Sequence, residues 1–90
     1  MIHYTKFVKY LGEMVTLKRI SLIDARYLFA TGCDIYIVQD LTEFDKKTDL
    51  RLFFCANKNQ GIKNFDDVCK VFRSHYKVKK SKTLLYFLLE

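Results

Sequence analysis

The run of six apolar residues from Leu84 to Leu89 constrains the fold of this 90-residue chain more than any other feature. Both alternating sides of the segment that begins at Thr83 are apolar, so it needs a cover on each side. It is either a fully buried strand or a short buried helix, and periodicity alone does not separate the two. Its length and the basic turn before it favour a strand. It is much shorter than the roughly 18 apolar residues that a membrane span requires.

Three segments are predicted to be helices, the first and third from the spacing of their apolar residues and the second from its end signals. The first covers residues 3–17. The second covers residues 21–31, where Ser21 is a candidate N-cap and Gly32 can end the helix. The third follows Asn64, another candidate N-cap. The apolar positions of the first are Tyr4, Phe7, Val8, Leu11, Met14 and Val15, and those of the third are Phe65, Val68, Cys69, Phe72 and Tyr76.

Two further segments favour strands because they are rich in β-branched and aromatic residues. These are residues 35–38 and 50–56, which most simply pair as a hairpin across a polar loop at 42–49. The chain has the length of one domain, so we expect residues 1–90 to form a single small α+β domain. The predicted order is α-α-β-β-α-β, with the helices packed on a three-stranded sheet.

The positive charge of the chain is concentrated in residues 57–82. This segment contains eight of the 16 Lys and Arg residues and only two acids, Asp66 and Asp67, and the net charge of the chain is +6. The rest of the chain is neutral overall, with an acidic cluster around residues 34–49. Clustered positive charge beside aromatic residues is typical of a surface that meets a polyanion.

The predicted function is therefore non-catalytic, regulatory binding of DNA or RNA through phosphate contacts. Lys70, Arg73 and Lys77 form a ridge on the third predicted helix, and a basic tail follows it. His75 and Tyr76 could stack on an unpaired base. The candidate phosphate-binding residues are Lys58, Lys63, Lys70, Arg73, Lys77, Lys79, Lys80 and Lys82.

Two other functions stay open. A small, basic, aromatic-rich domain without a catalytic motif resembles, in style, the accessory proteins of phages and viruses that bind and inhibit a host protein. The chain also has more apolar material than a small core needs, which is compatible with a protein partner or a homodimer. The weaker alternative is a toxin-like ribonuclease that uses His75 with Arg73 or Lys77.

No cofactor or metal is expected. The possible ligands are His3, Cys33, Cys55, Cys69 and His75, and none of the cysteines are close enough for a structural zinc site. Three widely spaced cysteines favour a reducing compartment, so we expect a cytoplasmic protein without disulfides and without a membrane segment.

One short stretch, residues 32–41, is similar to a segment near the catalytic end of tyrosine recombinases. It follows the pattern G-x-D-I-x-x-V-Q-x-L, as Gly32-Cys33-Asp34-Ile35-Tyr36-Ile37-Val38-Gln39-Asp40-Leu41. The active-site histidine and the context of the nucleophilic tyrosine do not follow it, so no site is transferred. The resemblance implies an alternative in which residues 34–41 are helical and form a helix-turn-helix with residues 21–31, whereas Ile-Tyr-Ile-Val favours a strand.

Overall fold

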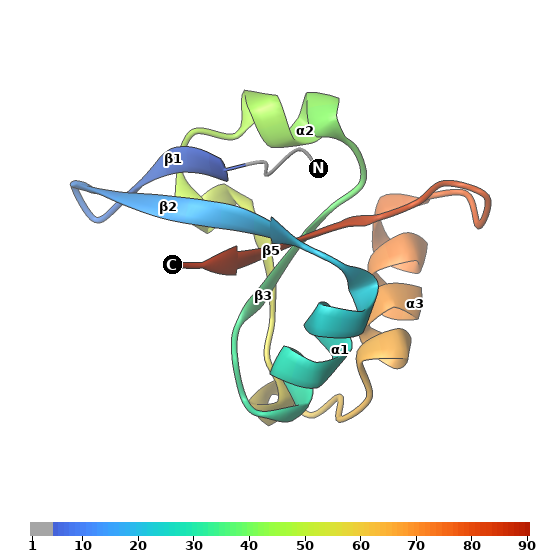
Figure 1. Ribbon diagram of the computed structural model, residues 1–90. Coiled ribbons are helices and arrows are strands. Elements are labelled where there is room, and N and C mark those ends of the chain that lie inside the picture. Colours follow the sequence, from blue (N-terminus) through green and yellow to red (C-terminus); the bar gives the residue numbers. More distant parts are fainter. Residues whose placement is uncertain (1–4) are drawn as a thin grey trace.

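The computed structural model describes residues 5–90, and these residues form a five-stranded antiparallel sheet with three α-helices (Figure 1). The strand order is β1-β2-β5-β3-β4. The expected three-stranded sheet with the order α-α-β-β-α-β is therefore wrong. The strands are β1 (Thr5–Tyr10), β2 (Glu13–Ile20), β3 (Ile35–Val38), β4 (Phe54–Ala56) and β5 (Leu85–Leu89), and the helices are α1 (Leu22–Ala30), α2 (Leu41–Lys46) and α3 (Phe65–Tyr76).

The largest correction concerns the helix predicted over residues 3–17, of which residues 3 and 4 lie outside the described part. In its place β1 and β2 pair as a hairpin, joined by Leu11 and Gly12. Both turn residues have positive φ, 51° and 84°, which is the geometry of the two-residue turn that matches the twist of a hairpin. Val8 and Val15 face each other across the hairpin and point inward, whereas Phe7 and Met14 point outward. The apolar spacing that suggested one helical face is thus divided between two sides of a sheet.

The prediction that the last apolar segment forms a buried strand is confirmed. β5 pairs with β2 on one side and with β3 on the other, so it lies at the centre of the sheet. Its residues from Leu85 to Phe87 are buried, and Phe87 is fully enclosed. Both faces of the strand are covered, because Tyr86 belongs to a core on one side of the sheet and Leu85 and Phe87 to a core on the other.

The sheet carries a hydrophobic core on each face. Figure 1 shows α1 and α3 on one side of the sheet and α2 on the other. On the α1–α3 side, the buried residues are Ala25, Phe29, Ile35, Ile37, Ala56, Phe65, Val68, Phe72, Leu84 and Tyr86. On the α2 side, they are Val8, Leu17, Tyr36, Val38, Phe44, Leu50, Phe53, Leu85 and Phe87.

The capping residues of two helices were predicted correctly. The Ser21 side chain accepts a hydrogen bond from the backbone N–H of Asp24 at the start of α1, at 3.1 Å. Asn64 accepts one from the backbone N–H of Asp66 at the start of α3, at 2.8 Å. These bonds satisfy amide groups that a helix leaves free in its first turn.

Two local predictions between the first and third helices are wrong. The loop expected at 42–49 contains α2, which Asp40 caps by accepting a bond from the backbone N–H of Glu43 at 2.8 Å. Of the strand expected at 50–56, only β4 is extended, because a 3₁₀ turn, Leu50–Leu52, precedes it. The pairing of β3 with β4 is as predicted. Since β3 is a strand, the helix-turn-helix alternative is also wrong.

Candidate polyanion-binding surface

The eight basic residues of the predicted surface lie on α3, on the loops at its two ends and on a short 3₁₀ turn, Lys58–Gln60. Lys70 and Arg73 are on the helix itself. Lys77 ends the helix in a left-handed conformation, with φ 55° and ψ 43°. The chain then turns back toward β5, and we call residues 77–82 the lysine turn.

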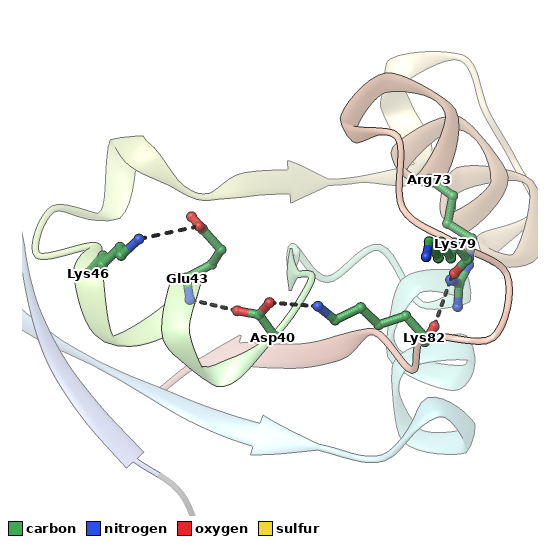
Figure 2. Close-up of polar contacts among 6 residues, drawn as sticks. All are labelled: Asp40, Glu43, Lys46, Arg73, Lys79 and Lys82. Carbon is green, nitrogen blue, oxygen red and sulfur yellow. Dashed lines mark hydrogen bonds and ion pairs between the residues drawn. The ribbon is translucent and has the colours of Figure 1, made fainter.

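Arg73 fixes the backbone of the lysine turn. Its guanidinium Nη1 donates to the carbonyl oxygen of Lys79 at 2.8 Å and to that of Lys82 at 2.7 Å (Figure 2). The backbone N–H of Val78 donates to the Arg73 carbonyl at 2.9 Å, and the Val78 side chain packs against the α1–α3 core. Hydrogen bonds from a charged donor are stronger than neutral ones. Arg73 therefore positions the turn and uses its guanidinium within the protein.

Lys82 ties the same turn to the start of α2. Its Nζ lies 2.9 Å from Oδ2 of Asp40, whose other oxygen caps α2, and Figure 2 shows this chain of contacts. The backbone N–H of Glu43 and the Lys82 ammonium together hold the pKa of Asp40 below its usual value. The two residues are 42 positions apart, so this contact joins distant parts of the chain.

Two further members of the predicted surface also have partners. Lys58 Nζ donates to the carbonyl oxygen of Ala30 at 3.2 Å, near the C-terminal end of α1, where a positive charge favours the helix dipole. Lys70 Nζ lies 3.8 Å from Oδ1 of Asp67 on the exposed side of α3. An exposed pair of this kind contributes little to stability and leaves the lysine accessible.

Four of the seven candidate lysines have no polar partner for their ammonium groups among residues 5–90. They are Lys63, Lys77, Lys79 and Lys80, and all are exposed. Three of the four lie on the lysine turn, beside the backbone that Arg73 and Lys82 hold. At the lysine turn, the structure thus separates Arg73 and Lys82, which fix the backbone, from Lys77, Lys79 and Lys80, whose side chains are exposed.

The two aromatic candidates for base stacking sit at the edge of the core. The Tyr76 ring packs against Phe72, with centroids 4.6 Å apart, and against Phe54 at 6.3 Å, yet it remains 46% exposed. His75 is exposed and meets the Tyr76 ring edge-on at 4.7 Å. Within residues 5–90, the His75 imidazole has this ring contact and neither a hydrogen bond nor an ion pair. No acid–base pair therefore supports the ribonuclease alternative.

The three cysteines are free and half-buried. Burial is the main cause that raises the pKa of the Cys55 thiol and of the Cys69 thiol. A raised pKa disfavours the nucleophilic thiolate. Among the described residues, no three His, Cys, Asp or Glu side chains gather as a metal site would require.

Comparisons of this chain with protein-family models, with curated proteins and with solved structures find no match. Within residues 5–90, none of the helices has the length and apolar character needed to cross a bilayer.

Sequence reasoning missed the role of Asp40, which holds the lysine turn through Lys82. An Asp three residues before Glu43 is nevertheless a recognisable helix-capping signal.

Proposed function

We propose that this protein binds the phosphate backbone of a nucleic acid through Lys77, Lys79 and Lys80, as a non-catalytic regulatory protein. The observation that carries the proposal is the lysine turn, where three exposed lysines sit on a backbone held by Arg73 and Lys82. A turn that is already ordered loses less conformational entropy on binding than a flexible tail. Lys63 and Lys70 extend the positive surface along α3 and its approach.

A salt titration tests this proposal. Binding of a fluorescent single-stranded or double-stranded oligonucleotide is measured by anisotropy between 50 and 200 mM salt. Each phosphate contact contributes a slope of about −0.7 to −0.9 to the plot of log affinity against log salt. The double variant Lys79→Gln/Lys80→Gln should therefore weaken binding and make the slope shallower by roughly 1.5.

The matched control is Lys9→Gln/Lys46→Gln, which removes the same charge from other elements. It should leave the slope nearly unchanged. Equal losses for both double variants would mean that net charge alone drives binding, and the lysine turn would then have no special role. Undetectable binding at low salt would exclude the proposal.

A further inference from the structure

The outward side of the β1–β2 hairpin carries large apolar side chains in contact with water. Phe7 and Leu11 are each 68% exposed and Met14 is 58% exposed. The register places Phe7 opposite Thr16 and Met14 opposite Lys9, so Phe7 and Met14 are diagonal neighbours on one side of the hairpin. Leu11 lies in the turn that joins the two strands. We call Phe7, Leu11 and Met14 the hairpin face.

Within residues 5–90, no other element covers the hairpin face. Val8, Val15 and Leu17 point to the opposite side, where they join the core beneath α2. Phe7 and Met14 alternate with these residues and lie on the other side of the sheet. Over β3 and β5 that side is covered by α1 and α3, but the cover does not reach the hairpin. A sheet side that faces water ordinarily carries polar residues. Exposed apolar clusters bordered by polar residues are typical of interaction sites.

The charge of this surface indicates what kind of partner it fits. Lys9 and Lys18 point to the same side as Phe7 and Met14, and none of the outward side chains of β1 and β2 is acidic. Glu13 pairs with Tyr10 on the other side. Glu90 forms an exposed ion pair with Lys18 at 4.0 Å, so Lys9 and Lys18 outnumber the one acid at this border. The hairpin face is thus an apolar patch with a positive border.

We propose that the hairpin face docks into an apolar pocket of a protein partner whose rim carries carboxylates. This surface is distinct from the lysine turn. In Figure 1 the hairpin turn projects at the left and the lysine turn at the right, at opposite ends of the molecule. The inference goes beyond the proposed nucleic-acid binding and does not depend on it.

Charge and side-chain chemistry favour this occupant over two others. A symmetric dimer built on this face would bring Lys9 and Lys18 of both copies into one interface, and like charges at an interface are unfavourable. A nucleic acid stacks its bases on flat aromatic or guanidinium groups, which Leu11 and Met14 do not supply. Aromatic side chains and Met are, in contrast, enriched in protein interfaces.

The test begins with the full chain immobilised through a tag at the end of the chain after β5 and exposed to nuclease-treated lysate of the source cell. The captured protein is identified, purified and titrated by calorimetry with wild-type and variant chains. The variant Phe7→Thr/Met14→Thr should weaken its affinity at least about tenfold, the loss expected of central apolar anchors. Leu11→Asn and Lys9→Glu should each weaken it as well.

The matched control is Ile23→Gln, because Ile23 on α1 is 75% exposed but lies outside the hairpin. It should leave the affinity within about twofold, since exposed residues outside a contact patch contribute little. Circular dichroism of each variant confirms that the chain is folded. Unchanged affinity of the hairpin variants, or failure to capture any protein, would overturn the proposal. So would hairpin variants whose only defect is in self-association, measured by sedimentation, or in oligonucleotide binding.

The two proposals fail separately. Lys79→Gln/Lys80→Gln should weaken oligonucleotide binding and leave the protein partner's affinity unchanged. Phe7→Thr/Met14→Thr should do the reverse. Loss of both activities in either variant would contradict two independent surfaces.

Discussion

Leu11 occupies a backbone conformation that an L-residue with a bulky side chain rarely adopts. Its φ is 51° in the hairpin turn, and its side chain is 68% exposed. The left-handed region costs most L-residues about 1–2 kcal/mol, whereas Asn and Gly tolerate it. The fold therefore retains at this position a residue that costs stability and contributes little packing. This is the pattern expected where a side chain serves binding.

The stability of Leu11→Asn tests this interpretation at the residue scale. We expect the substitution to raise the free energy of unfolding by about 1 kcal/mol, because it relieves the left-handed strain. For a domain of this size, that gain corresponds to a rise in Tm of roughly 4–8 °C. Thermal unfolding followed by circular dichroism measures it.

The neighbouring substitution Gly12→Ala provides the control with the opposite sign. Gly12 has φ 84°, so a Cβ there introduces strain and should lower Tm. A lower Tm for Leu11→Asn would show that the leucine stabilises the hairpin. The interpretation that Leu11 costs stability and serves binding would then be wrong.

Between elements, Asp40 accepts hydrogen bonds from the backbone N–H of Glu43 and from the Lys82 ammonium, and these bonds make stability depend on pH. The pKa of Asp40 is lower in the folded protein than its usual value of 3.8. The stabilisation from such a carboxylate is fully present above its pKa in the unfolded chain. It is lost as the pH falls through its pKa in the folded protein. We expect the free energy of unfolding to fall as the pH drops below about 4, and Asp40→Asn to make that fall shallower.

Urea unfolding between pH 6 and pH 2.5 measures this pH dependence. Asp49, whose pKa is lowered to about 2 by its hydrogen bonds with Arg51, contributes to the same acid transition. Glu13→Gln is a suitable control, since Glu13 is exposed and has no ion pair within residues 5–90. If Asp40→Asn and Glu13→Gln change the acid slope equally, the contacts of Asp40 with Glu43 and Lys82 do not cause the pH dependence.

The elements that sequence predicted correctly are those whose signals are local. Ser21 and Asn64 each precede a helix by one residue, and Ile35-Tyr36-Ile37-Val38 has a strand composition that needs no distant partner. The β1–β2 hairpin was missed because Phe7, Leu11 and Met14 face water, so its apolar residues follow a helical spacing that the sheet does not use. The positive φ values at Leu11 and Gly12 and the pairing of β2 with β5 distinguish the hairpin from a helix, and composition reveals neither.

The candidate site was predictable as a region but not as a set of roles. Positive charge located residues 57–82, yet sequence could not show which side chains are engaged. The acceptors of Lys58 and Lys82 are 28 and 42 residues away. Arg73 was expected on a phosphate-contacting ridge, and the structure instead directs its guanidinium to two carbonyl oxygens of the lysine turn.

At the scale of the whole molecule, stability depends on the central strand because β5 belongs to both cores. Phe87 stacks on Phe44 with ring centroids 4.1 Å apart, and both side chains are fully buried. Phe87→Ala should lower the free energy of unfolding by about 3–5 kcal/mol, a large share of what a small domain has. We expect the variant to be largely unfolded at 37 °C, as measured by urea titration and circular dichroism.

Leu89→Ala on the same strand is the control, because Leu89 is 36% exposed. Leu89→Ala should lower the free energy of unfolding by much less than Phe87→Ala does. Comparable losses for the two variants would contradict the arrangement of the α2-side core.

The strand order also determines when the fold can be completed during synthesis. β5 is the last of the five strands to be translated, yet it is the one that joins β1–β2 to β3–β4. Until it emerges, the hairpin and the β3–β4 pair each have an edge without its partner, and unpaired edges favour association between chains. The nascent chain can therefore form its two halves early but cannot assemble them. Its period of greatest exposure to chaperones, and to aggregation, lies in the interval before residues 85–89 are made.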